Sequence, residues 1–137
     1  MAGTWKAIQD RVYVLLEADT SLRTLTGHAS GDKRIYNAHD VAHELTSTKP
    51  AYLVLYERDD APPEQKRETF NMQVQVLALG LTRAKDCGDR VEAVLHRQAL
   101  AATGWTDVSM LRRMRRSRYD DRYKCWQVDI DIQIRAF

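Results

Sequence analysis

The most constraining feature of the sequence is the alternation of apolar and polar residues between Lys124 and Ala136. Apolar side chains occupy every second position from Trp126 to Ala136, and polar side chains fill the positions between them. This period of two is typical of a strand with one face in a core and the other toward solvent. A run from Lys124 to Ala136 would span roughly 43 Å, so we expect an unusually long strand of an antiparallel sheet.

Two stretches with helical periodicity accompany that strand. Thr4 is a candidate N-cap for a first helix, and Gly27 is a candidate end for a short helical turn over residues 19–25. Thr82 is a candidate N-cap for a second main helix that ends before Gly104. The apolar stripes of the two helices are Trp5, Ile8, Val12, Leu15 and Leu16 in the first, and Cys87, Val91, Val94, Leu95, Gln98 and Ala102 in the second.

The remaining strands are shorter. A long connection, 28–49, shows only a brief strand signal at Ile35 and Tyr36. Strands are predicted over 52–56, 70–76 and 108–118, in addition to the C-terminal one. The order α-β-β-α-β-β predicts an α+β fold: a four-stranded antiparallel sheet with two main helices on one face. At 137 residues, 44% hydrophobic and 29% charged, the chain fits a single folded domain, 1–137.

The last two predicted strands must pair so that their alternating apolar residues fall on the same face of the sheet. A turn of odd length would align Val108, Met110 and Met114 with the isoleucine face of the C-terminal strand. It would also bring Arg113 and Arg115 to the same face as Asp129 and Asp131, with Arg135 on that face too. Opposite charges across neighbouring strands attract, so we expect the aspartates to neutralise these arginines.

The run Arg112–Arg118 carries five arginines and admits two interpretations. It forms either a phosphate-binding stripe, with Tyr119 and Tyr123 as stacking partners, or a solvated sheet face balanced by aspartates. Alternation spreads the arginines over both faces of a strand, which favours the second interpretation. The net charge of +2 does not decide between them.

No residue pattern predicts catalysis, a cofactor or a metal. His39 and His43 share a helical spacing but lack further ligands, with His28 the one near candidate. Asp129 and Asp131 lie among polar residues, where neither carboxyl meets the apolar pocket that a general acid needs. Cys87 falls on a core stripe without a basic partner. We therefore expect a protein that is not an enzyme.

Residues 51–56 are apolar on both faces of their predicted strand. Ala51, Leu53 and Leu55 face one way, and Tyr52, Val54 and Tyr56 face the other. A two-layer domain covers one sheet face, so either a neighbouring subunit or the connection 28–49 is expected to cover the second face. The sequence leaves these two alternatives open.

The two cysteines have no CxxC spacing, and the sequence shows neither an apolar leader nor a long apolar window. We therefore expect synthesis in a reducing cytoplasm, with neither secretion nor membrane insertion.

The order of the elements resembles that of a known family. It is carried by "TWKAIQDRVYVLLEAD", "SLRTLTG", "RIYN", the proline-led strand "KPAYLVLYE", "FNMQVQVLALG", "DRVEAVLHRQAL" and a closing hairpin. Together these segments resemble the tail-completion or tail-terminator proteins of long-tailed double-stranded DNA bacteriophages, over almost the whole chain.

The resemblance implies a structural virion protein. It implies a ring, usually hexameric, that caps the tail tube in the neck region and joins it to the head–tail connector. DNA would pass through the bore, with Arg113, Arg115, Asp129, Asp131 and Arg135 as lumen candidates. Subunit-interface candidates are Tyr52, Val54 and Tyr56, and docking candidates in the charged segment 57–67 are Asp59, Asp60, Glu64, Lys66 and Arg67. A head-completion or other neck protein is an alternative, as is a small nucleic-acid-binding module that uses the Arg112–Arg118 strand.

Overall fold

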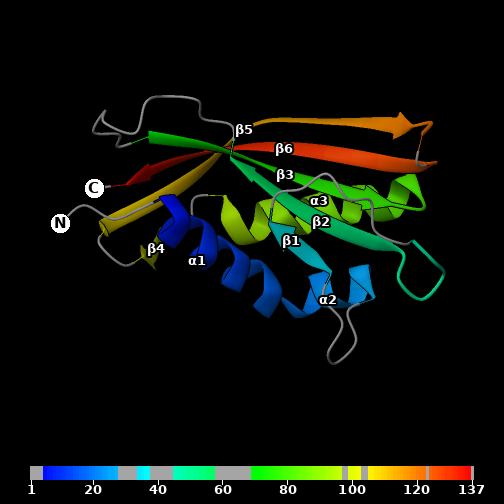
Figure 1. The fold of residues 1–137 in the computed structure, drawn as a ribbon, viewed down its shortest axis with the longest axis horizontal. Coiled ribbons are helices and arrows are strands. Elements are labelled where there is room, and N and C mark those ends of the chain that lie inside the picture. Colours follow the sequence, from blue (N-terminus) through cyan, green and yellow to red (C-terminus); the bar gives the residue numbers. More distant parts are fainter. Residues whose placement is uncertain are drawn as a thin grey trace.

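The computed structural model describes residues 5–27, 34–37, 45–57, 69–96, 99–102, 105–122 and 124–136. Within these ranges the chain forms three helices and six strands (Figure 1). In chain order they are α1 (Trp5–Ala18), α2 (Thr20–Thr26), β1 (Ile35–Asn37), β2 (Ala51–Glu57), β3 (Thr69–Ala78), α3 (Leu81–Leu95), β4 (Ala99–Ala102), β5 (Trp105–Asp120) and β6 (Cys125–Ala136).

The strands form one mixed sheet in the order β1-β2-β3-β6-β5-β4. β1 runs parallel to β2, and every other neighbouring pair is antiparallel. The predicted α+β class is confirmed, whereas the predicted four-stranded antiparallel sheet is wrong. The sheet gains β1 and β4 as short strands at its two edges, and both lie in stretches where the sequence shows little or no period.

The core lies between the helices and one face of the sheet, which we call the inner face. Ile8, Val12 and Leu16 of α1 have no exposed surface, as the predicted stripe requires. The apolar side chains of β6 from Val128 to Ile134 meet them in the same cluster, with Met72, Val74 and Val76 of β3 beside them. Two main helices on one face are therefore confirmed, and α2 adds a third, short helix.

The short helix α2 ends at Gly27 as the sequence predicts, but it begins one residue later than predicted, with Asp19 as its N-cap. The Asp19 carboxylate accepts a 2.9 Å hydrogen bond from the Leu22 backbone N–H, which caps the first turn. Gly27 closes the helix in the left-handed region at φ 73°. A Cβ at Gly27 would also collide with the Thr48 carbonyl oxygen, so glycine is required here for both reasons.

Arg34 anchors β1 beside this helix end. Its side chain is buried, and its guanidinium donates to the backbone carbonyls of Thr26, Lys49 and Ala51 at 3.1–3.3 Å. The guanidinium also lies 5.6 Å from the ring centre of Tyr52. A buried charge needs such partners, and these partners tie α2, β1 and β2 together.

The second main helix differs from its predicted bounds. Its N-cap is Gly80, which makes no side-chain cap hydrogen bond, and Thr82 lies within the first turn. The helix ends at Leu95, with His96 in an extended conformation. Gln98 lies outside the described residues, and Ala102 belongs to β4, where it pairs with Trp105. The run Ala99–Ala102 carries no period that separates a helix end from a short strand, so the sequence could not reveal β4.

The β5–β6 hairpin follows the predicted parity only as far as Arg112. From Val108 to Arg112 the residues pair as expected, with Met110 opposite Ile134. A β-bulge then places Arg113 as an extra residue, and Met114 lies opposite Asp131. The turn closes between Asp120 and Cys125, an even number of residues, so the predicted odd-length turn is wrong. A one-residue shift reverses the facing of every later side chain.

Candidate functional site: the outer polar face

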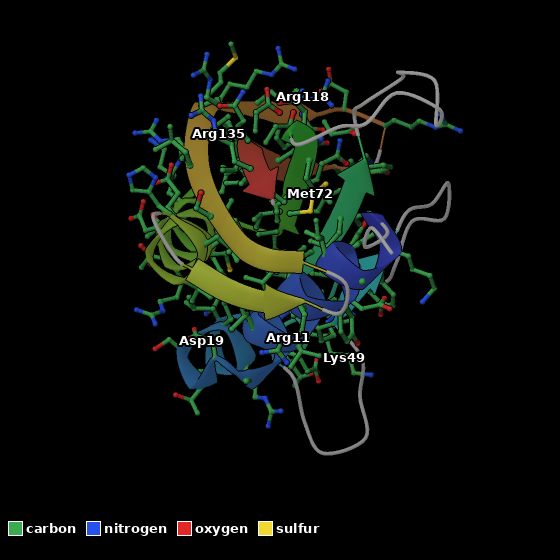
Figure 2. All side chains as sticks on the ribbon, turned by 90° about the vertical axis from the view of Figure 1, so that its left-hand side faces the viewer. Arg11, Asp19, Lys49, Met72, Arg118 and Arg135 are labelled. Carbon is green, nitrogen blue, oxygen red and sulfur yellow. The ribbon has the colours of Figure 1, made fainter. Side chains whose placement is uncertain are left out.

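The sheet face opposite the helices carries a layer of polar side chains. Gln73 on β3 and Gln127 and Asp129 on β6 are only 6%, 4% and 3% exposed. Four exposed arginines lie beside this layer: Arg113, Arg116, Arg118 and Arg135. We call these residues, together with Asp131, the outer polar face. In Figure 2, Arg118 and Arg135 lie on the side of the sheet away from α1 and α2.

Hydrogen bonds join the polar layer across strands. The Gln73 amide donates to Asp131 Oδ1 at 3.0 Å, and the Gln75 amide donates to Gln73 Oε1 at 2.8 Å. Along β6, the Gln127 amide donates to Asp129 Oδ1 at 2.8 Å. Each carboxylate is thereby held by an amide, which fixes the layer as a rigid polar surface.

Asp129 is shared by two arginines. Arg116 Nε and Arg118 Nε both lie 3.8 Å from Asp129 Oδ2. The two arginine side chains are 59% and 61% exposed, whereas the Asp129 side chain is 4% exposed. The predicted neutralisation of arginines by a β6 aspartate therefore occurs at Asp129, but through Arg116 and Arg118.

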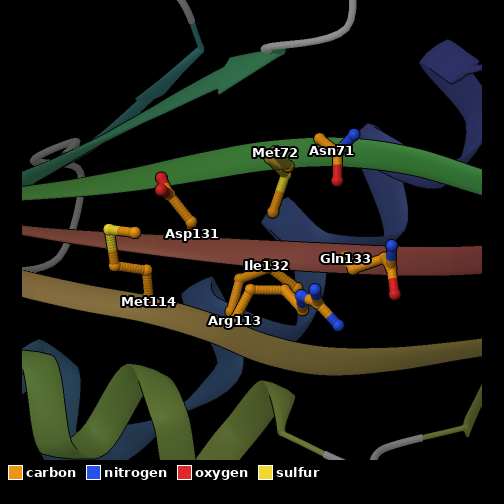
Figure 3. A pocket seen from close by; sticks show the side chains of 7 residues that line it. All are labelled: Asn71, Met72, Arg113, Met114, Asp131, Ile132 and Gln133. Atoms are coloured by element: carbon orange, nitrogen blue, oxygen red, sulfur yellow. The ribbon is translucent and has the colours of Figure 1, made fainter.

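Arg113 is the one arginine of the predicted pair that reaches this face. It lines a shallow pocket beside the bulge, with Met114 and Asp131 (Figure 3). Asn71 and Gln133 line the same pocket from β3 and β6. Asp131 thus accepts a hydrogen bond from the Gln73 amide and lines an open pocket. This position suits contact with a partner, and it lacks the apolar surroundings that a general acid needs.

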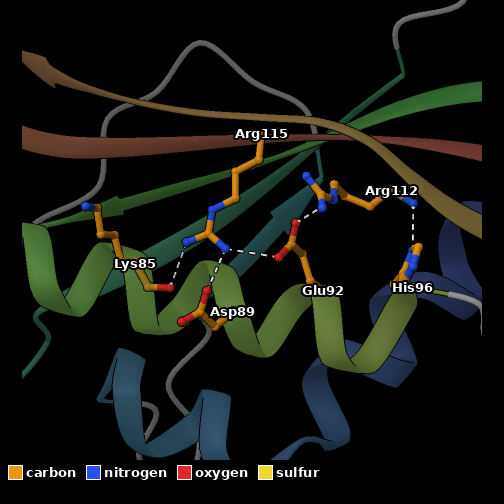
Figure 4. A network of polar contacts seen from close by, with 6 residues as sticks. All are labelled: Lys85, Asp89, Glu92, His96, Arg112 and Arg115. Carbon is orange, nitrogen blue, oxygen red and sulfur yellow. Dashed lines mark hydrogen bonds and ion pairs between the residues drawn. The ribbon is translucent and has the colours of Figure 1, made fainter.

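Arg115 points to the inner face, and its predicted place beside Asp129 and Asp131 is wrong. Its guanidinium donates to Asp89 at 2.6 Å, to Glu92 at 3.0 Å and to the Lys85 carbonyl at 3.1 Å (Figure 4). Burial alone would lower the pKa of Arg115, but the hydrogen bonds to Asp89 and Glu92 outweigh it and raise the pKa. The side chain therefore remains a cation that fastens β5 to α3.

Arg112 joins the same network. Its Nε lies 3.0 Å from Glu92 Oε1, and its backbone N–H donates to His96 Nδ1 at 3.1 Å. The arginine run is thus divided: two arginines bind α3, while Arg113, Arg116 and Arg118 belong to the outer polar face. Sequence periodicity places Arg113 and Arg115 beside the β6 aspartates in place of Arg116 and Arg118, because no residue signal marks the bulge that turns the latter two outward.

The apolar end of the outer face is covered within the chain. Tyr52 and Val54 are 3% and 4% exposed and form a cluster with Leu77 and Cys125. Tyr36, Leu45 and Tyr56 pack against that cluster. Since Leu45 belongs to the connection 28–49, burial of Tyr52 and Val54 favours cover by that connection over cover by a neighbour. A role for Tyr52, Val54 or Tyr56 in a subunit contact remains a prediction.

Several predicted candidates lie outside the described residues: His28, His39, His43, Tyr123, Asp59, Asp60, Glu64, Lys66 and Arg67. In the described part of the chain, no three His, Cys, Asp or Glu side chains come together in a metal-binding group. Burial raises the pKa of the Cys87 thiol to about 12 and also raises that of Cys125. Both thiols are buried and free. Across the same described ranges, no helix has the length and apolar character to cross a membrane.

No protein-family model matches the sequence, and no curated protein matches it either. Among solved structures, the chain is similar to one described as the virion of a native gene transfer agent particle, with 22% sequence identity and a TM-score of 0.74. The similarity covers 96% of this chain and 95% of that chain. The two chains therefore share one fold over almost their entire lengths.

Proposed function

We propose that this chain is a structural protein of a phage-like particle, a tail-terminator subunit that forms a ring on the tail tube and joins it to the head–tail connector. The observation that carries the proposal is the shared fold with a virion chain over 96% of this chain and 95% of the other. The resemblance of the sequence to tail-terminator proteins of bacteriophages independently supports a role in a phage-like particle. Such a subunit would act by assembly and would not be an enzyme.

The outer polar face suits the bore of such a ring. Its carboxylates are sunk into the sheet while Arg113, Arg116, Arg118 and Arg135 are exposed, so a passing polyanion would meet arginines first. Asp129 and Asp131 would limit how tightly the polyanion is held. We propose Arg113, Asp129, Asp131 and Arg135 as lumen residues and exclude Arg115, because it points to α3.

Two further contacts of the subunit are proposed from the sequence. The charged segment 57–67 would dock onto the tube or the connector. Tyr56, which is less buried than Tyr52 and Val54, is the aromatic residue of that strand best placed to touch a neighbouring subunit. The ring would be made in the cytoplasm of the host and reside in the neck of the particle.

The test is assembly on a tube. Sedimentation and negative-stain microscopy of the purified chain, alone and with purified tail tubes, should show rings at one end of each tube, with DNA-sized openings. The charge-reversal variant Arg113→Glu/Arg135→Glu should still form rings, since these residues face the bore, but should slow DNA passage. Strictly monomeric chain that also leaves tubes uncapped would contradict the proposal. Rings that bind only head connectors would instead indicate a head-completion protein.

A nucleic-acid-binding module remains a second candidate because Arg116 and Arg118 share a single carboxylate. That candidate predicts DNA binding by the isolated chain at low salt, weakened by raised salt and by loss of both arginines. Absence of such binding would exclude it while leaving the ring proposal intact.

A further inference from the structure

Among the described strands, none pairs with the outer half of β5 on one side, which leaves an open strand edge there. β5 spans Trp105–Asp120, but β4 pairs with it only as far as Ser109. On its other side β5 pairs with β6 up to Asp120. No described strand lies beside β5 from Arg113 to Asp120, and in Figure 1 this orange part of β5 is the outermost ribbon of the sheet.

The open edge begins at the bulge and stays regular after it. His96 accepts the backbone N–H of Arg112, so the edge is closed as far as that residue. From Met114 to Asp120 the pairing with β6 is continuous, which keeps the backbone extended and its outward N–H and C=O groups in a regular row. A stretch of this length matches the usual length of a strand that could add to it.

Side chains on this edge define the chemistry of an added strand. Met114 and Tyr119 are 53% and 46% exposed, so apolar surface is available at both ends of the stretch. Between them, Arg116 and Arg118 occupy alternate positions on the outer side, and both lie 3.8 Å from one oxygen of Asp129. Two guanidinium groups therefore share one buried carboxylate and retain exposed donors.

We propose that the edge from Met114 to Asp120 binds an extended acidic segment of a partner protein by strand addition. Backbone hydrogen bonds would supply the ladder, as in other cases of β-augmentation. Carboxylates two residues apart on the added strand would lie beside Arg116 and Arg118, because alternate residues share a face and strands lie about 4.8 Å apart. This inference goes beyond the proposed virion role and does not depend on it. Arg116 and Arg118 belong to both surfaces, but the inference concerns the backbone edge of β5 and a protein partner of defined charge.

In many proteins, edge strands carry charges and bulges that prevent association. Here the bulge lies at one end of the stretch and leaves Met114–Asp120 regular. The exposed apolar side chains of Met114 and Tyr119 would weaken any such protection. Nucleic acid is less suited, since it offers no backbone donors or acceptors in register with a strand edge.

The probe is a fluorescein-labelled ten-residue peptide with blocked ends, glutamate at alternate positions, and valine or threonine between. We expect saturable binding by anisotropy at low salt and chemical-shift changes confined to residues 113–120. A peptide of the same sequence, methylated at alternate backbone nitrogens on the ladder side, should lose binding. Arg116→Ala/Arg118→Ala should weaken binding about tenfold, the expected loss for two exposed ion pairs.

The matched control is Lys6→Ala/Arg11→Ala, which removes two exposed cations from α1 and should leave affinity within about twofold. Unchanged binding of the methylated peptide would overturn strand addition. An oligonucleotide that binds more tightly through the same two arginines would assign the surface to nucleic acid. A dimer of this chain that excludes the peptide would assign the β5 edge to a second copy of the chain. Each of these results, like no binding at all, overturns the proposal and leaves the ring test unaffected.

Discussion

Substituting Arg115 by alanine tests the register of the whole β5–β6 hairpin. The Arg115 side chain is 21% exposed and donates to Asp89, Glu92 and the Lys85 carbonyl. Asp89 is 69% exposed, so water screens that ion pair and it contributes little. The bond to Glu92, which is 21% exposed, and the bond to the carbonyl dominate, since a hydrogen bond to a charged group contributes about 1.5–3 kcal/mol. We expect Arg115→Ala to lower the free energy of unfolding by about 2 kcal/mol.

Urea unfolding followed by circular dichroism measures this loss, and the same strand supplies the controls. Arg113→Ala and Arg116→Ala remove the same side chain from exposed positions one or two residues away, and each should change stability by less than about 0.5 kcal/mol. If the three variants were equally stable, Arg115 would not face α3. The bulge at Arg113 and the register beyond it would then be refuted.

Three further predictions concern other parts of the fold. Asp19→Ala should lower stability by about 1 kcal/mol through loss of the α2 cap. Hydrogen bonding by Arg90 lowers the Asp19 pKa. The contribution of the Asp19 charge to the free energy of unfolding is therefore present above about pH 5 and is lost as the pH falls through the folded pKa. Urea titrations at several pH values should show a smaller acid-side loss of stability for Asp19→Asn. Cys87 and Cys125 should resist a thiol reagent in the native protein at pH 8 and both react in denaturant, whereas rapid native labelling would contradict their burial. Ile130→Ala should cost about 3–4 kcal/mol in urea unfolding because Ile130 is fully buried at the centre of the sheet, and a loss below about 1 kcal/mol would contradict that position.

Sequence reasoning succeeded where one residue pattern extends over many positions. The alternation of β6, the polar–apolar strand around Val74 and the apolar stripe of α1 each repeat a single period several times. The end of the short helix α2 is predicted by Gly27, whereas the capping role of Asp19 is shown only by the structure. In each case local geometry and burial require the same residues, so the pattern and the structure agree.

The failures share a different origin. β4 is too short to show a period. β1 gives only the brief strand signal at Ile35 and Tyr36, and its place in the sheet depends on β2, which lies beyond a long connection. The bulge at Arg113 has no glycine or proline to mark it, yet it decides which arginines meet Asp129 and which meet α3. The sequence therefore predicts correctly that arginines meet Asp129 on this surface, and wrongly which arginines take part.

The position of β6 has a consequence for how the chain folds during synthesis. β6 is the last of the six strands to leave the ribosome, yet it lies between β3 and β5. Until it emerges, β3 exposes an unpaired edge beside an apolar face that includes Val74 and Val76, and the two halves of the sheet cannot join. The nascent chain is then open to association with other nascent copies. A chaperone that holds the chain until β6 is released would therefore increase the yield more than one that acts on the finished domain.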